Sequence, residues 1–298
     1  MPGYDSGCCF RPSRDGRARV VWEITTACNL SCGFCHAQPH TQHGPPAEEL
    51  VDGLKRVGRW GARGVIVTGG EPLGRADCLD FVTRAADLGL EVDLCTNATL
   101  VDAALARQLG RALTEISVSI DSADAEVHDR LRGRPGAWRA AVRGIHHLVA
   151  AGLELHAITI ACDDTCPSLD RTLDLFEDLG VHSVTLLGPV RVPGAERNLR
   201  LSPNARAALV ADLPRLRERA TRLTVNTKRV TQPPSAAACP AGTSIWGIDA
   251  GGHLLPCVLL KGETAGVPLA RLVDCRDWRE VGQRLSWQPT DGLAGCGD

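Results

Sequence analysis

The chain of 298 residues carries a formal net charge of −2, and 44% of its residues are hydrophobic. This length can bury one large domain, or one large and one small domain. The near-neutral charge gives no support for polyanion or acidic-lipid binding, and the 4% aromatic content disfavours base stacking, so we expect no nucleic-acid partner. No run of about 18 apolar residues and no N-terminal signal segment occur. We therefore expect a cytoplasmic protein without a membrane partner.

Apolar segments alternate with longer amphipathic segments up to about Gly188. Strands are expected at Val20–Thr25, Val65–Thr68, Glu91–Thr96, Glu115–Ile120, Glu154–Ile160 and Ser183–Leu187. Helices are expected at Ala47–Trp60, Ala76–Leu88, Asp102–Leu109, Ala137–Ala151 and Ser168–Leu179. The alternation predicts an α/β fold with a parallel sheet and helices outside. Six such units are too few for a closed eight-stranded barrel, so a partial (β/α)6 TIM-like barrel or an open sheet follows, with ligands at the carboxyl ends of the strands.

The pattern changes beyond this point. A further helix is expected at Pro203–Arg219, and the segment around Pro233-Pro234 has the composition of a linker. Ser244–Ile248 and His253–Leu255 flank a Gly-Gly turn and predict a β-hairpin, which is followed by a short helix at Asp277–Leu285. We therefore expect an N-terminal arm over residues 1–19, a barrel over 20–227 and a small hairpin and helix domain over 228–298.

Three closely spaced cysteines follow the first predicted strand. Thirteen cysteines in a cytoplasmic chain indicate metal or redox chemistry rather than structural disulfides. Cys28, Cys32 and Cys35 can bind one face of an iron–sulfur cube and leave one iron open for another ligand. Zinc is the alternative, with His36 as a fourth ligand, although structural zinc prefers four protein ligands in two pairs.

The spacing of this loop, C-x-x-x-C-x-aromatic-C with Phe34 at the aromatic position, resembles the signature of the radical S-adenosylmethionine (SAM) superfamily. The turn after the second strand, Gly69-Gly70-Glu71-Pro72, matches the GGEP motif of that family. Its glycines would let the backbone approach a ligand closely, and Glu71 would accept hydrogen bonds from the ammonium group of SAM.

Further motifs continue the resemblance, which covers Val20 to about Gly188. Asn97 lies where the family often carries Thr-Asn-Gly, although Ala98 replaces the glycine. Ser119 and Asp121 form the family's S-x-D segment and would face the ribose or the methionyl part of SAM. The stretch His128–Gly133 resembles the family's H-D-x-x-R-G stretch.

This resemblance implies the cofactors and the reaction type. A 4Fe–4S cluster on the three cysteines would donate an electron to bound SAM, after receiving it from an external donor such as flavodoxin or ferredoxin. The resulting 5′-deoxyadenosyl radical would abstract a hydrogen atom from a small-molecule substrate. The implied cofactor-binding residues are Phe34, Gly69, Gly70, Glu71, Pro72, Asn97, Ser119 and Asp121.

A second cysteine set spans the predicted hairpin. Cys239 and Cys257, with Gly252 between them and Pro256 directly before the second cysteine, resemble the SPASM/twitch extension of radical SAM enzymes, which holds an auxiliary 4Fe–4S cluster. That extension usually ends in a C-x-x-C pair, whereas here Cys296 and Cys275 are the cysteines nearby. The alternatives are three cysteines with an open iron, Cys275 as the fourth ligand, or no second cluster.

Two functional branches follow from the resemblance. In the first, the enzyme is an epimerase or dehydrogenase that abstracts a carbinol hydrogen from a sugar or cyclitol of the aminoglycoside type, for antibiotic biosynthesis. A thiol would return hydrogen to give the epimer, and Cys275, Cys162 and Cys95 are the candidate donors. The alternative is thioether or carbon–carbon crosslinking of a ribosomal peptide. We expect this branch less, because the sequence indicates no leader-binding module. A non-catalytic iron–sulfur or zinc protein is a third possibility.

Overall fold

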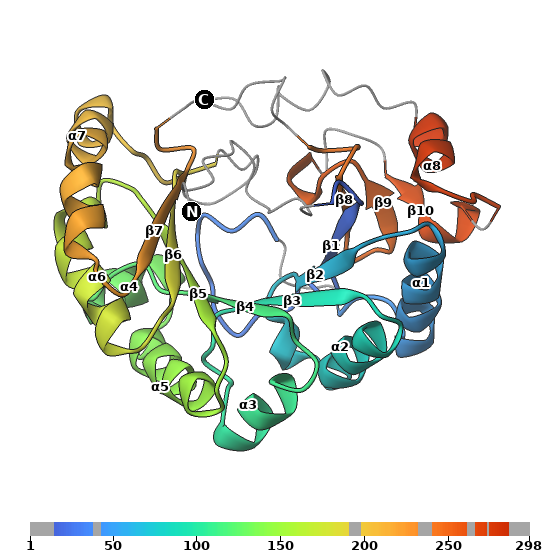
Figure 1. The fold of residues 1–298 in the computed structure, drawn as a ribbon, viewed down its shortest axis with the longest axis horizontal. Helices are drawn as coiled ribbons and strands as arrows, with labels where there is room; N and C mark the ends of the chain where they lie inside the picture. The colour runs from blue at the N-terminus through green and yellow to red at the C-terminus, as the bar shows by residue number, and fades with distance from the viewer. Residues whose placement is uncertain are drawn as a thin grey trace.

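The computed structural model describes residues 15–37, 43–190, 198–231, 240–260, 266–272 and 274–285. One ten-stranded sheet runs through this part of the chain in the order β10-β9-β8-β1-β2-β3-β4-β5-β6-β7 (Figure 1). Its strands are β1 Arg19–Glu23, β2 Gly64–Thr68, β3 Glu91–Thr96, β4 Glu115–Ser119, β5 Leu155–Ile160, β6 Ser183–Leu187, β7 Thr224–Lys228, β8 Ile245–Ile248, β9 His253–Leu255 and β10 Val267–Pro268.

Helices cover the outer, convex side of the curved sheet (Figure 1). They are α1 Ala47–Arg59, α2 Cys78–Asp87, α3 Ala103–Leu109, α4 Ala125–Arg132, α5 Ala137–Ala150, α6 Leu169–Asp178, α7 Pro203–Arg219 and α8 Trp278–Leu285. Strands β1 to β7 are mutually parallel, as the βαβ pattern requires. The predicted α/β class and partial-barrel architecture are therefore confirmed.

Alternation along each strand separates an outer core from an inner face. Trp22 and Val67 point outward into the large core beneath the helices, where the Trp22 ring meets the Phe81 ring edge-on with centroids 5.4 Å apart. Val21 and Ile66 point to the concave side, where a small inner cluster also contains Val258. The loop that follows β1 lies on this concave side (Figure 1).

The predicted hairpin is present, and it extends the main sheet. β8 and β9 are antiparallel, while β8 pairs in parallel with the free side of β1. Trp246 of β8 stacks on Trp278 of α8 with ring centroids 5.4 Å apart, so the last described helix packs on the same sheet.

The predicted boundary at residue 228 between the barrel and the small domain remains a prediction. None of the helices in the described residues is long and apolar enough to span a membrane.

Candidate functional site

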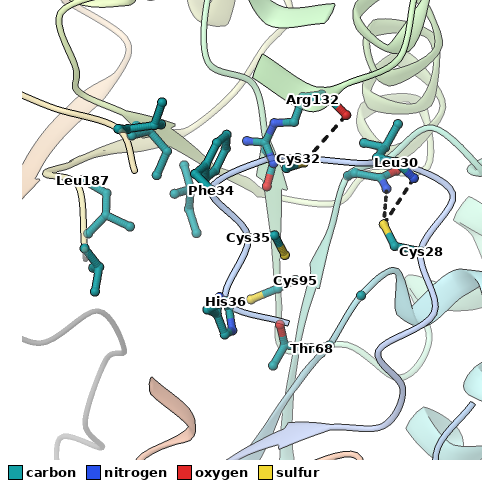
Figure 2. Close-up of a pocket in the computed structure, with 18 of the residues that line it drawn as sticks. Cys28, Leu30, Cys32, Phe34, Cys35, His36, Thr68, Cys95, Arg132 and Leu187 are labelled. Carbon is teal, nitrogen blue, oxygen red and sulfur yellow. Dashed lines mark hydrogen bonds between the residues drawn. The ribbon is translucent and has the colours of Figure 1, made fainter. Parts of the chain in front are cut away.

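The cysteine loop leaves the carboxyl end of β1 and turns back on itself, because the Cys35 amide donates to the Cys32 carbonyl at 3.1 Å. Two sulfurs accept backbone hydrogen bonds: the Leu30 amide lies 3.3 Å from Cys28 Sγ, and the Ala37 amide lies 3.4 Å from Cys35 Sγ. Figure 2 shows the three thiols on one loop. They line a cavity of about 240 Å³. Amide donors to sulfur favour the thiolate form, which is the form that binds iron.

The donor set fits a cubane cluster better than a single ion. Burial raises the pKa of all three thiols, that of Cys35 to about 11, so assembly of a cluster must release their protons. Within the described ranges, no three His, Cys, Asp or Glu side chains converge as a single metal ion requires. A cubane takes one thiolate on each of three irons, so its protein ligands lie farther apart than those of a single ion. His36, the fourth ligand of the zinc alternative, lies instead 3.2 Å from the buried carboxylate of Glu23.

The glycines of the Gly-Gly-Glu-Pro turn pack against the cysteine loop. A Cβ on Gly69 would lie 2.1 Å from the Thr25 carbonyl oxygen, and one on Gly70 would lie 2.2 Å from that of Ala27. Gly69 also has φ +141°, which side chains rarely adopt. The close approach that the sequence motif indicates is thus made to the neighbouring loop, and it sets the position of the first cysteine.

Replacement of Gly70 by alanine is expected to push this loop away from β2. Overpacking of this kind costs about 1–3 kcal/mol of unfolding free energy, and the iron content after reconstitution should fall with it. Gly74→Ala is the matched control, because its nearest atom would be 3.8 Å away. Urea unfolding and iron analysis of both variants check the prediction, and equal behaviour of the two would contradict it.

Glu71 begins a hydrogen-bonded chain that reaches the first cysteine. Its carboxylate accepts from Thr96 Oγ1 and from the Asn97 amide, each at 2.8 Å. The Asn97 side chain then donates to Asn29 Oδ1 at 2.9 Å, beside Cys28 in sequence. Burial raises the pKa of Glu71 because it disfavours the charged carboxylate. The hydrogen bonds that Glu71 accepts oppose this effect and stabilise the charged form. The structure gives Glu71 a role in joining the end of β3 to the cysteine loop.

Arg132, the last residue of α4, meets the middle of the same loop. Asp121, fully buried after β4, accepts from Arg132 Nε at 2.7 Å and from its Nη2 at 3.0 Å. The guanidinium lies 5.6 Å from the centre of the Phe34 ring, and the Arg132 carbonyl accepts from the Ser31 amide at 3.1 Å. Gly133 ends the helix at φ +66°. A Cβ at this position would lie 2.2 Å from the Ser31 carbonyl oxygen.

His128 of α4 supports this arrangement as a neutral acceptor. Its Nδ1 accepts from the Asp121 amide at 3.2 Å, and burial lowers the pKa of the imidazole to about 4. The unfolded state therefore binds more protons than the folded state between about pH 4 and 6.5, so stability rises with pH in this window and is lost as pH falls through it.

His128→Asn is expected to remove this part of the acid sensitivity. An asparagine oxygen can still accept the Asp121 amide but does not titrate. Lowering the pH from 7 to 5 should cost the parent protein about 2 kcal/mol more than the variant. Urea unfolding at both pH values measures the difference, and identical pH dependence of the two proteins would refute the assignment.

The cavity brings together many of the residues singled out from the sequence. Its lining includes Cys28, Cys32, Phe34, Cys35 and Cys95, which Figure 2 labels. Gly69, Gly70, Asn97 and Ser119 also belong to the lining. Glu71, Pro72 and Asp121 are buried outside the lining. From there Glu71 accepts a hydrogen bond from the backbone amide of Asn97, and Asp121 accepts one from the guanidinium of Arg132. Asn97 and Arg132 both line the cavity.

The three candidate hydrogen donors are dispersed. Cys95 of β3 lines the cavity, whereas Cys162 is buried behind it, with Thr165 Oγ1 3.6 Å from its sulfur. Cys275 lies in the outer core, where its carbonyl accepts from Trp60 Nε1 at 2.7 Å. Among the auxiliary-cluster candidates Cys257 is buried after β9, while Cys239 and Cys296 lie outside the described residues.

Several lining residues were not selected from the sequence. Arg132 lies in the His128–Gly133 stretch, to which the sequence assigns no site role, and the sequence indicates His36 only as a possible zinc ligand. The others are strand-end or apolar positions: Leu30, Thr68, Thr96, Ile158, Ile160, Leu187, Gly188, Pro189, Val190, Leu199 and Leu259. Inward-facing positions at the carboxyl ends of β2, β5 and β6 were the available signal for several of them.

Comparisons with known proteins give a separate indication of the family. The sequence model of the Radical SAM superfamily matches residues 22–176. The chain is 38% identical over 168 residues to the AdoMet-dependent heme synthase of Oleidesulfovibrio alaskensis, covering 54% of this chain and 42% of the relative. It is 29% identical over 209 residues to the mycofactocin maturase of Mycolicibacterium smegmatis, covering 68% of this chain and 49% of the relative. The chain thus spans about half the length of these curated relatives.

Among solved structures, SuiB of Streptococcus suis superposes with a TM-score of 0.72 at 18% identity, covering 91% of this chain and 68% of SuiB. This likeness shows a shared fold. SuiB has also been crystallised with S-adenosylmethionine and with the precursor peptide SuiA.

These findings correct one expectation from the sequence. The relatives are a heme synthase and a mycofactocin maturase, which contradicts a sugar or cyclitol epimerase or dehydrogenase. The cavity wall formed by Ile158, Ile160 and Leu187 is apolar, whereas a polyhydroxylated ring needs polar partners for its hydroxyl groups. The surplus of thiols, which favoured epimerisation, is spread over distant parts of the fold.

Proposed function

The chain belongs to the radical SAM superfamily, and from this premise we propose that it modifies a peptide, by a thioether or carbon–carbon crosslink. Family membership brings a 4Fe–4S cluster and SAM as cofactors. We assign Cys28, Cys32 and Cys35 as the cluster ligands, since their sulfurs face one cavity and two accept backbone amides. An external reductant of the flavodoxin or ferredoxin class would supply the electron.

The division of the cavity into a sulfur-bearing wall and an apolar wall carries the peptide proposal. Ile158, Ile160, Leu187 and Val190 line the same cavity as the three cysteines, and such a surface suits a hydrocarbon side chain. The match to the maturase extends over 68% of this chain, against 54% for the heme synthase. The shared fold with SuiB, a protein crystallised with a precursor peptide, also supports a peptide substrate.

When bound, the cluster and SAM would together supply a 5′-deoxyadenosyl radical that abstracts hydrogen from the substrate. The residues of this chain hold the parts in place. Asn97 and Ser119 offer polar groups to SAM inside the cavity. The turn at Gly69 and Gly70 packs against the backbone of the cysteine loop and so fixes its position. Glu71 and Asp121 hold Asn97 and Arg132 in position. The apolar wall excludes water from the reacting carbon.

Two finer assignments accompany this proposal. Cys95 is the candidate thiol that lines the cavity, and so it is the preferred hydrogen donor if one is used. Cys239, Cys257 and Cys296 are proposed as auxiliary-cluster ligands. Cys275 is the weakest candidate for both roles, because it packs in the outer core with Trp60 and Trp278.

Substrate-dependent turnover tests the peptide proposal. The anaerobically reconstituted protein is incubated with dithionite, SAM and short precursor peptides encoded beside it, and mass spectrometry follows both 5′-deoxyadenosine and the peptide. A peptide that loses a pair of hydrogen atoms supports the proposal. An iron-coproporphyrin substrate is tested in parallel, since the 38% identity to a heme synthase makes a tetrapyrrole the second candidate. Turnover of the tetrapyrrole but of no peptide would overturn the proposal.

A further inference from the structure

Arg132 lines the described cavity, and the buried carboxylate of Asp121 holds its guanidinium. Its side chain is 12% exposed, while that of Asp121 is wholly buried. Both oxygens of Asp121 are engaged: they accept two hydrogen bonds from Arg132, and Oδ1 also accepts from the Ile160 amide at 3.2 Å. The guanidinium therefore has one fixed orientation, which a flexible surface arginine lacks.

This ion pair is oriented with its positive end toward the cysteine loop. Arg132 lines the cavity and Asp121 does not. The guanidinium lies near the ring of Phe34, between Cys32 and Cys35 in sequence, and the Arg132 carbonyl is 3.8 Å from Cys32 Sγ (Figure 2).

A fixed positive charge beside a cluster acts on electron transfer. Reduction adds one negative charge to the cluster, and in a buried site the attraction of a nearby cation is weakly screened. Net charge and hydrogen bonds at the sulfurs are among the factors that set the reduction potentials of iron–sulfur clusters. The partner carboxylate lies farther away, so it weakens the effect without cancelling it.

We propose that Arg132, oriented by Asp121, raises the reduction potential of the cluster held by Cys28, Cys32 and Cys35, and so makes the cluster easier to reduce. The inference rests on the proposed ligand assignment and does not depend on the peptide substrate. Asp121 is a positioning residue for the guanidinium of Arg132, and its own negative charge partly offsets the effect of that guanidinium on the cluster.

The test is the midpoint potential of the reconstituted protein without SAM, measured by a redox titration followed by electron paramagnetic resonance. Arg132→Met should make reduction at least tenfold less favourable, a shift of about 59 mV to more negative potential for a one-electron couple. Arg132→Lys keeps the charge and loses the two-point contact, so its potential should stay closer to that of the parent protein. Asp121→Asn removes the opposing charge and should shift the potential in the positive direction.

The opposite shifts in Arg132→Met and Asp121→Asn separate an electrostatic role from general loosening of the loop, which would move both variants the same way. An unchanged midpoint potential in Arg132→Met overturns the proposal. If this variant keeps the midpoint potential of the parent protein but binds SAM more weakly in equilibrium dialysis, Arg132 serves SAM binding and the proposal is wrong. If neither Arg132 variant assembles a cluster, Arg132 merely holds the loop and the proposal is also wrong. Iron content of Cys32→Ala tests the ligand assignment separately, because full iron in that variant would remove the premise.

Discussion

Replacement of any one of Cys28, Cys32 and Cys35 by alanine is expected to abolish the reductive cleavage of SAM. In the proposed assignment each thiolate would hold a different iron, and the remaining pair would not keep the cluster in the cavity. The three side chains are at least partly buried, so solvent thiols do not readily replace them. Iron and sulfide analysis after anaerobic reconstitution should show loss of the cluster, and 5′-deoxyadenosine release should fall to the level without protein.

Cys166→Ala is the matched control for these variants. Cys166 begins the short helical turn Cys166–Ser168 after β5, is half-buried and does not line the cavity. Its replacement should leave both iron content and SAM cleavage at parent levels. Full activity in a variant that lacks all three loop cysteines would disprove the ligand assignment and with it the proposed chemistry.

The second large effect is expected on stability, from Asp121→Asn. The substitution preserves shape but leaves the guanidinium of Arg132 in a buried place without its counter-charge. Breaking a buried pair from one side costs about 3–5 kcal/mol, so urea unfolding of the cluster-free protein should shift to clearly lower urea concentration. The double variant Asp121→Asn with Arg132→Met should recover part of the loss, because no unpaired charge then remains.

Asp170→Asn provides the comparison on the surface. Asp170 pairs with Arg215 and Arg219 between α6 and α7, and all three side chains are more than two-fifths exposed. Exposed pairs contribute about 0–1 kcal/mol, so this variant should unfold close to the parent protein. Similar destabilisation by Asp121→Asn and Asp170→Asn would show that burial of the first pair has no energetic consequence.

Much of the fold followed from local patterns, and the exceptions have physical reasons. The six predicted strands correspond to β1 to β6, since each is an apolar run bounded by turn residues. β7 was missed because only Val225 and Thr227 of its five residues are buried, and its polar neighbours read as the start of a linker. α4 was missed as a helix because it has only eight residues. Its boundaries are set by an Asp124 cap and a left-handed Gly133.

The candidate site shows the same limit at the level of side chains. The cysteine loop was found because its ligands lie within eight residues, where spacing alone determines what they can share. Arg132 meets this loop across a sequence separation of 100 residues, and Glu71 reaches Asn97 across 26. Such contacts depend on how the βα units curve around one another, so a motif could indicate these residues without revealing their partners.

By itself, the amino-acid sequence determined the class of cofactor, the order of the βα units and the hairpin, because loop spacing and residue periodicity are local properties of the chain. Only the tertiary structure decided that the hairpin extends the main sheet beside β1, that one of the three candidate donor thiols reaches the cavity, and that the wall opposite the cysteines is apolar. The reason is that each of these depends on which surfaces pack together. Packing is a sum over distant contacts that no short segment contains.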